Sequence, residues 1–458
     1  MREETRNFSF RYKLMKTKID FSHIFMVATL LLILSCKSGS DQPVLLDNSY
    51  ATKAVDDLTQ IIIHDIFSPP QAARIYAYTT IAGFEAARFG APALTSLAGQ
   101  LRDFGSVPAP DKETEINFDL AGLEAAYTTG KALIFSEATL EEKKAAAYQK
   151  IKTNTKLSNK VWKNSLAFGQ QVAAHVLAWA DKDNYKQTRT FPKYSIQDNP
   201  ATWKPTPPSY MQGIEPSWRE IRPFVLDSAQ QFKPIAPTPF DTKEDSKFFK
   251  EVMEVYLTGK NLTDEQKAIA NFWDCNPYVT HQTGHVMFAT KKITPGGHWM
   301  GIASQACLQA GKSYVETSQI LAITAITLSD GFISCWDEKY RSVLVRPETV
   351  INTHIDETWA PLLQTPPFPE YTSGHSVISS AASVALTNIF GDNFAYVDSV
   401  EVPYGLPPRS FKSFYQAADE ASISRLYGGI HYMPAITEGV KQGKNVGALI
   451  SARIKLRE

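Results

Sequence analysis

The residues Thr372–Phe390 read TSGHSVISSAASVALTNIF and are followed by Gly391. From Ser376 onwards, apolar residues at helical spacing predict a helix that ends at the glycine. The first N–H groups of such a helix have no partner within it, and the helix dipole places positive charge beside them. The Ser373-Gly374 turn is therefore a candidate anion site, with His375 placed to exchange protons. The alternative is that Ser373 only caps the helix and His375 lies on the surface.

Helical signals also cover most of the chain on either side of this stretch. Capping residues or apolar periodicity predict helices at 68–87, from the Thr139 capping box, at 161–180, from the Thr263 capping box to Cys275, and at 317–336, 411–427 and 435–454. Between about 183 and 239, ten prolines alternate with aromatic residues. That texture predicts an ordered, irregular excursion that covers helices, with an active-site mouth as the alternative.

These signals predict a nearly all-α protein of two packed helix bundles. We expect an N-terminal helical part at 51–239, which includes the Pro-rich excursion, and a C-terminal part at 240–458. The 458 residues are 43% hydrophobic, so a large core is expected. With 47 basic and 47 acidic residues the net charge is zero, which argues against nucleic acid as a partner.

The N-terminus resembles a bacterial lipoprotein signal peptide. Basic residues precede an apolar run at 24–34, which ends in Ser35-Cys36. The run is short for a membrane span, and a small residue directly before cysteine suits lipoprotein processing. We therefore expect a signal peptide at 1–36, lipidation of Cys36 and a tether at 37–50. The lipid would be the only contact with a bacterial envelope membrane, on its periplasmic or exterior side.

Two further basic clusters accompany the Ser-Gly-His turn. Lys339 and Arg346 are separated by six residues, and Pro347 disfavours helix at the arginine. Arg425 and His431 flank a glycine pair that can turn both side chains into one cavity. Together the clusters provide three cations, free amides and two imidazoles, which is a suitable set for binding an oxyanion.

The order Lys339-x6-Arg346-Pro347, Thr372-Ser373-Gly374-His375 and Ser424-Arg425-x5-His431 resembles the signature of a known superfamily. It unites type 2 phosphatidic acid phosphatases, bacterial acid phosphatases and vanadium haloperoxidases, and the chain looks most similar to vanadium chloroperoxidase-like bacterial lipoproteins. The resemblance implies an oxyanion bound by Lys339, Arg346, Ser373, Gly374 and Arg425. It implies that His375 is the acid/base and His431 the vanadium ligand or nucleophile.

Two positions depart from the family pattern. Thr372 replaces the usual proline, which should reduce only the rigidity of the turn. Ala435 stands where the family commonly has aspartate, so the partner that orients His431 is open. Glu438 or Thr437, on the next helical turn, are candidates to replace it.

The resemblance leaves two enzymatic activities open. A vanadium-dependent haloperoxidase would hold vanadate on His431 and oxidise halide with hydrogen peroxide, with Lys339 polarising the bound oxidant. Trp336 and Phe368 match aromatic positions beside the halide site, and Asp274 resembles the acid that pairs with the last arginine; core packing is the alternative for the two aromatics. The second activity is a phosphomonoester hydrolase without cofactor, in which His431 attacks phosphorus.

Other readings have less support. A non-catalytic surface lipoprotein rests only on Ala435 and the tether. His281, His285 and His298 lack the spacing of a zinc site and are expected at the pocket rim or on the surface. Cys275, Cys307 and Cys335 are expected to be buried thiols, with one disulfide as an open alternative.

Overall fold

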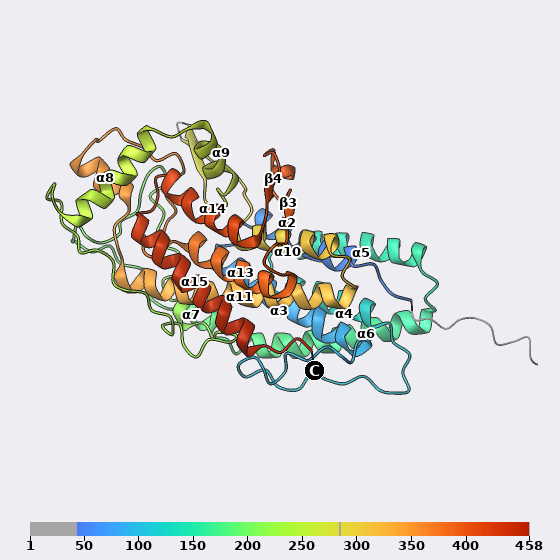
Figure 1. The fold of residues 1–458 in the computed structure, drawn as a ribbon. Coiled ribbons are helices and arrows are strands. Elements are labelled where there is room, and N and C mark those ends of the chain that lie inside the picture. Colours follow the sequence, from blue (N-terminus) through green and yellow to red (C-terminus); the bar gives the residue numbers. More distant parts are fainter. Residues whose placement is uncertain (1–43, 284, 458) are drawn as a thin grey trace, which may run out of the picture. The chain divides into compact units, whose positions relative to one another are not determined.

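The computed structural model describes residues 44–283 and 285–457, and most of these residues are helical (Figure 1). The predicted lipoprotein signal peptide and Cys36 lie outside the described residues. The longer helices are α2 (Ser49–His64), α3 (Pro69–Ala87), α4 (Phe118–Lys131), α5 (Glu137–Asn154), α6 (Asn159–Ala180), α8 (Lys247–Lys260), α9 (Asp264–Phe272), α10 (Pro295–Gln309), α11 (Tyr314–Ser342), α12 (Pro347–His354), α13 (Gly374–Phe390), α14 (Phe414–Tyr427) and α15 (Met433–Arg453).

The remaining elements are short. They are the helix α7 (Tyr185–Thr188), the 3-10 turns η1 (Arg88–Gly90), η2 (Trp218–Glu220) and η3 (Val402–Tyr404), and the strands β1 (Thr280–Thr283), β2 (Val286–Ala289), β3 (Tyr396–Asp398) and β4 (Arg409–Phe411). The strands form two antiparallel pairs, β1 with β2 and β3 with β4. The prediction of a nearly all-α fold is confirmed.

Helix α13 lies at the centre of the C-terminal helices and packs against α11, α14 and α15. A glycine stripe on α15 brings two of these backbones together. A Cβ at Gly443 would lie 2.0 Å from the Val377 carbonyl oxygen, and one at Gly447 would lie 2.6 Å from that of Ala381. Because nothing larger than hydrogen fits there, glycine at these positions is what allows α15 to lie so close to α13.

The N-terminal helices pack around α3, whose residues are all buried except Gln71. It contacts α4, α6 and α11, so it joins the N-terminal helices to the helix that carries Lys339. Residues 44–458 form one unit. The predicted division into parts at 239/240 stays a prediction.

Sequence signals placed some helices better than others. Helix α3 begins and ends as expected, with Ser68 in a capping box. Helix α9 begins after Thr263 as expected but ends at Phe272, before the predicted end at Cys275. The predicted helix start at the Thr139 capping box was wrong, because α5 begins at Glu137 after Ser136. The backbone amides of Phe135 and Ser136 donate to the carboxylate of Asp65. This tertiary contact holds the chain so that the helix begins before Thr139. Helices α10 and α12 and both strand pairs had not been predicted.

Helix α11 is the one described helix long and apolar enough to cross a membrane. The apolar window of α11 is entirely buried within the protein, however. A buried core helix meets the same criterion of length and composition, and the contacts of α11 with α3, α10 and α13 account for its apolar character.

The Pro-rich excursion packs along α11. Its Trp203 and Trp218 are fully buried, and the amides of Phe224 and Val225 donate to the buried carboxylate of Asp330 on α11. The backbone carbonyl of Ile214 accepts hydrogen bonds from Trp336 and Tyr340 of the same helix. The excursion therefore covers a helix, as expected, and also fixes the aromatic side chain of Trp336.

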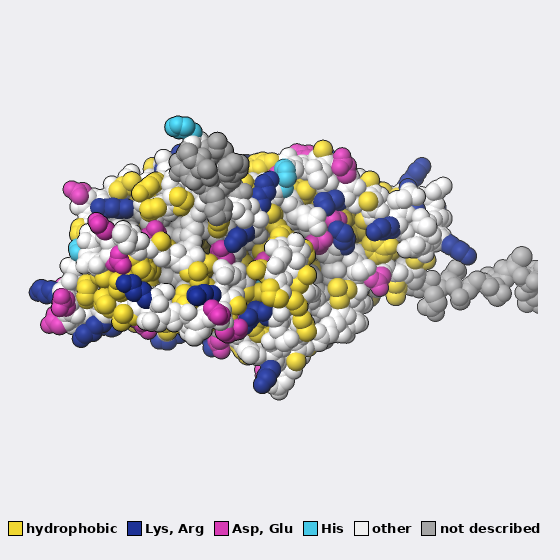
Figure 2. Space-filling model, turned by 90° about the horizontal axis from the view of Figure 1, so that it is seen from above, with side chains coloured by type: hydrophobic (Ala, Val, Ile, Leu, Met, Phe, Trp, Pro, Cys, Tyr) yellow, Lys and Arg dark blue, Asp and Glu magenta, His cyan; other side chains and the backbone are white. Residues whose placement is uncertain are grey.

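Charged side chains are spread over the face seen in Figure 2, where lysines and arginines alternate with aspartates and glutamates. This face has no large region of one sign. Charges of both signs are mixed on this face, so anion binding there depends on local groups.

Candidate active site

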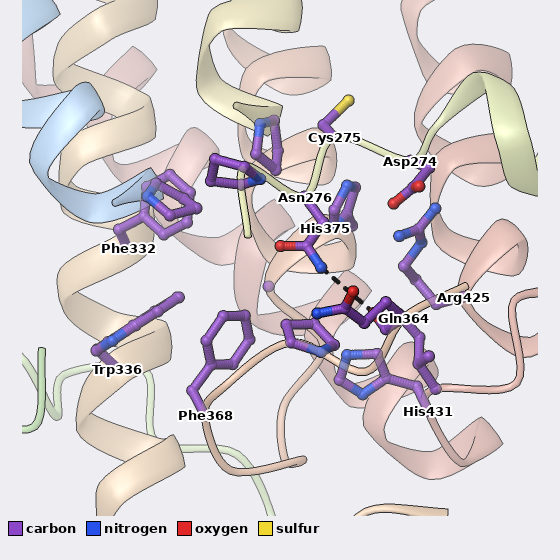
Figure 3. Close-up of a pocket in the computed structure, with 16 residues that line it drawn as sticks. Asp274, Cys275, Asn276, Phe332, Trp336, Gln364, Phe368, His375, Arg425 and His431 are labelled. Atoms are coloured by element: carbon purple, nitrogen blue, oxygen red, sulfur yellow. Dashed lines mark hydrogen bonds between the residues drawn. The ribbon is translucent and has the colours of Figure 1, made fainter. Parts of the chain in front are cut away.

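A pocket lies where the three predicted clusters meet, at the N-terminus of α13 (Figure 3). The space between the atoms that line the pocket is about 490 Å³, including the part that is open to solvent. The predicted residues that line it are Asp274, Trp336, Phe368, Gly374, His375, Arg425 and His431. Lys339, Arg346 and Ser373 are not part of this lining: Arg346 contacts the lining residues Phe368, Ile430 and His431, whereas Lys339 binds the segment before Ser373. The structure thus brings the predicted site residues together, some of them indirectly.

His431 is held between a carboxylate and a guanidinium. Its Nδ1 lies 2.8 Å from Glu370 Oε1, and its Nε2 lies 3.2 Å from Arg346 Nη1. Since arginine only donates, Nε2 must accept and the ring proton must lie on Nδ1. Burial, followed by the charges of Arg346 and Lys339, holds the pKa of His431 well below its usual value. The ring is therefore neutral, with the Nε2 lone pair available as a ligand or nucleophile.

Glu370 is a functional residue that the sequence analysis missed. It is fully buried, and its Oε1 also accepts the backbone amide of Tyr432. Burial raises the pKa of Glu370 to about 7. Glu438 and Thr437, the predicted substitutes for the missing aspartate, were wrong: Glu438 pairs with Lys441, and Thr437 donates to Pro434. The only signal in the sequence was a carboxylate three residues before Ser373.

Lys339 reaches the segment before the Ser-Gly turn rather than the open pocket. Its ammonium donates to the backbone carbonyls of Pro369, Glu370 and Thr372, at 3.0, 3.1 and 2.6 Å. Burial lowers the pKa of Lys339 to about 7, but three acceptors match the three N–H groups of the charged form. Lys339 thus holds the turn in place by hydrogen bonds and contributes positive charge to the pocket.

Arg346 takes an extended backbone conformation directly before α12, as Pro347 predicts. Its side chain donates to the carbonyls of Phe368 and Ile430. The remaining nitrogen, Nη2, is buried and has no hydrogen-bond partner among the described residues. One arm of the guanidinium is therefore free to donate to an anion beside His431.

The N-terminus of α13 presents the predicted amides. Ser373 caps the helix by accepting from the amide of Ser376, and its own amide donates to Ala435, so it offers no free amide. The next two amides, of Gly374 and His375, have no backbone acceptor within the described residues. His375 Nε2 is also buried without a partner. Burial, then the charge of Arg425, holds the pKa of His375 well below its usual value, so this ring is neutral too.

Arg425 lies on the opposite side of the pocket from Trp336 and Phe368 (Figure 3). It donates to Ser424 and to the carbonyl of Trp273. Asp274 faces its guanidinium in Figure 3, in line with the predicted pairing, but the ion pair that Asp274 makes is with Lys292. Asp274 therefore influences Arg425 through charge rather than through a direct contact.

The two predicted pocket aromatics, Trp336 and Phe368, contact each other with ring centroids 5.0 Å apart. The Lys339 ammonium lies 5.0 Å from the Phe368 centroid, within the range of a cation–π interaction. The two rings form an apolar wall, and Lys339 places positive charge directly behind it. A large, weakly hydrated anion could contact the rings and be attracted by the charge at the same time.

The polar groups fit a bound oxyanion. Three buried cations, Lys339, Arg346 and Arg425, lie around the site, and besides Glu370 and Asp274 the carboxylates of Glu338 and Glu348 act on Lys339 and Arg346. Buried cations are stabilised by a bound anion, and the unpartnered Arg346 Nη2 and His375 Nε2 are placed to contact it directly.

His298 was expected at the rim or on the surface, and this was wrong. It is fully buried on α10, between the carboxylates of Asp398 and Glu401.

The three described cysteines are buried and unpaired, so the disulfide alternative is excluded.

Comparison with known proteins gives the same picture. The model of the vanadium chloroperoxidase (VCPO) second helical-bundle domain matches residues 319–456. A crystal structure titled as the first bacterial vanadium-dependent iodoperoxidase is 49% identical, with a TM-score of 0.86 over 92% of this chain and 99% of that one. The chain belongs to the vanadium-dependent haloperoxidases. This haloperoxidase also shares its fold with a holo-type bacterial vanadium-dependent chloroperoxidase, at 16% identity and a TM-score of 0.66 over 91% of this chain and 98% of that one. No curated protein matches it.

Proposed function

We propose that this haloperoxidase oxidises iodide with hydrogen peroxide, using vanadate held by His431. The observation that carries the proposal is the neutral His431, which lines the pocket together with the buried Arg425 and has the buried Arg346 beside its Nε2. The choice of iodide follows the 49% identical iodoperoxidase, which covers most of the chain.

Each residue of the site has a separate role in the proposed reaction. Glu370 keeps the proton on Nδ1 of His431 and leaves Nε2 to bind the metal. Arg346, Arg425 and the amides of Gly374 and His375 hold the oxyanion oxygens. When bound, vanadate supplies a Lewis acid that activates peroxide without a change in oxidation state. His375 Nε2 accepts and returns a proton, and Trp336 and Phe368 present an apolar wall to the halide.

A paired assay tests the proposal. Protein freed of anions is titrated with vanadate, and iodide and bromide oxidation by peroxide is followed at each step. We expect activity to rise with vanadate to one equivalent, with a higher kcat/KM for iodide than for bromide. A vanadate-saturated, folded protein that oxidises neither halide would overturn the proposal.

The same cations would also bind phosphate, so the assay needs a phosphatase arm. Vanadate-free protein is given nitrophenyl phosphate, first alone and then with vanadate as a competitor. Turnover that depends on His431, without halide oxidation by the loaded protein, would favour the phosphomonoester hydrolase. We expect little turnover.

We further propose that Cys36 is lipidated and anchors the enzyme to a bacterial envelope membrane. The support is the sequence pattern around Cys36. Intact mass after expression is the test: we expect wild-type protein to begin at a diacylated Cys36 and Cys36→Ala protein to lack the lipid. A wild-type mass without lipid would exclude the anchor.

A further inference from the structure

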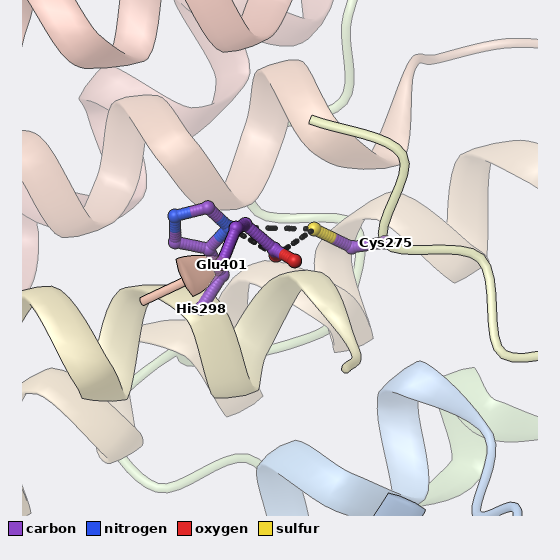
Figure 4. A group of neighbouring side chains, drawn as sticks. All are labelled: Cys275, His298 and Glu401. Atoms are coloured by element: carbon purple, nitrogen blue, oxygen red, sulfur yellow. Dashed lines mark hydrogen bonds and ion pairs between the residues drawn. The ribbon is translucent and has the colours of Figure 1, made fainter. Parts of the chain in front are cut away.

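A second buried polar cluster lies behind the pocket, built by three separate segments. Cys275 follows α9, His298 lies in the first turn of α10, and Glu401 precedes η3. Their ligand atoms meet in one place (Figure 4). Cys275 Sγ is 3.5 Å from His298 Nδ1 and 3.7 Å from Glu401 Oε1, and Nδ1 is 3.0 Å from Oε1.

These separations are close to those between ligands of a tetrahedral zinc ion. Bonds of about 2.3 Å to sulfur and about 2.0 Å to nitrogen or oxygen place such ligand atoms about 3.3–3.6 Å apart. The sulfur and nitrogen donors favour zinc over calcium or magnesium, which prefer oxygen alone. Three protein ligands leave a fourth position for water.

Asp398 completes the arrangement from the far side of the imidazole. Its Oδ2 lies 2.8 Å from His298 Nε2, so it accepts the proton there. In the neutral ring this leaves the Nδ1 lone pair directed at Cys275 and Glu401. A carboxylate on the outer nitrogen of a histidine is the usual support for a zinc ligand.

We propose that Cys275, His298 and Glu401 bind a zinc ion, independently of the vanadate at His431. The ion would join the Cys275 segment, α10 and the turn after β3. Because Asp274 and Cys275 also line the pocket, zinc would hold that wall of the active site in place. Glu401 exposes 8% of its side chain and is the most exposed of the three proposed ligands.

Metal analysis and cobalt substitution test this proposal. The zinc content of the full, purified protein is measured by mass spectrometry. Chelator-treated protein is then titrated with Co²⁺, whose thiolate charge-transfer absorption reports a cysteine ligand. We expect one zinc per chain, and one equivalent of cobalt to produce the band. Absence of both in folded protein would overturn the proposal.

The variants make the assignment specific. We expect Cys275→Ser to lose both signals and Cys307→Ser, at another buried cysteine, to keep them. A cobalt band that persists in Cys275→Ser would refute the site. If Cys275→Ser fails to fold by circular dichroism, Glu401→Gln decides: we expect at least about tenfold weaker zinc binding, and unchanged binding would contradict the proposal.

Discussion

Two buried histidines of this protein, His431 and His298, differ in charge because different charged side chains lie beside them. His431 has one carboxylate, Glu370, and burial, followed by the charges of Arg346, Lys339 and Arg425, holds its pKa well below the usual value. His298 has two carboxylates, Asp398 and Glu401, so its pKa is well above the usual value. Burial alone would make both rings neutral, and the difference shows that the nearby charges decide.

The contrast separates the histidine that reacts from the one that holds the fold. A neutral ring with an unprotonated Nε2 suits a ligand or nucleophile, whereas an imidazolium between two carboxylates is a structural ion pair until a metal replaces its proton. Four predictions test this difference, in order of decreasing effect.

The largest effect is expected from removing the reactive ring. His431→Ala should reduce halide oxidation by more than about 10³-fold, because the ligand of the proposed vanadate is lost. Vanadate-loaded wild-type and variant proteins are compared by kcat/KM for iodide. His64→Ala, at an exposed histidine outside the pocket, is the matched control and should keep full activity. Substantial activity in His431→Ala would remove His431 from its proposed role.

Removing one carboxylate from the other histidine should affect stability instead. In chelator-treated protein without zinc, Asp398→Ala should lower the free energy of unfolding by about 3 kcal/mol, because the buried charge pair between Asp398 and His298 is broken. Denaturant unfolding measures this, with the exposed Asp392→Ala as control.

The effect of Asp398→Ala has a defined pH dependence. The pKa of His298 is raised on folding, so its contribution is complete below pH 6.5 and is lost as the pH rises past the raised value. The difference between wild type and variant should therefore shrink at alkaline pH. A constant difference would mean that His298 is not charged.

A smaller effect is expected when Glu370 loses its charge. Glu370→Gln keeps an acceptor for His431 Nδ1 but not the carboxylate, so vanadate affinity should fall by about 10–100-fold. Equilibrium titration with vanadate measures it. Glu438→Gln, which alters the carboxylate paired with Lys441, should leave affinity unchanged. Equal effects of the two variants would argue against Glu370 as the positioning residue.

The smallest effect concerns Lys339 and pH. Burial lowers its pKa to about 7 in the anion-free protein, and a bound anion would favour the charged form. Anion affinity should therefore decrease above pH 7, by at most about tenfold per pH unit from this group. Vanadate titrations at pH 6 to 9 should show a steeper decrease for wild type than for Lys339→Met. Parallel curves would show that Lys339 does not take up a proton on binding.

Much of the fold and the active site could be predicted from the sequence, because the signals are local or ordered. The Ser68 and Thr263 capping boxes specified helix starts, and Pro347 specified the extended backbone of Arg346. The three motifs specified which cations and histidines would meet. Each of these features depends on a few neighbouring residues whose conformational preferences are strong.

The tertiary structure alone decided how those residues are used. Lys339 donates to three carbonyls, and His298 is buried between two carboxylates. Glu370 is the carboxylate that contacts His431, since this chain has Ala435 where the family commonly has aspartate. These outcomes depend on which groups approach from distant segments, as Asp398 approaches His298 from one hundred residues away. Charge state and hydrogen-bond partner are set by burial and by nearby charges, and neither is encoded in local spacing.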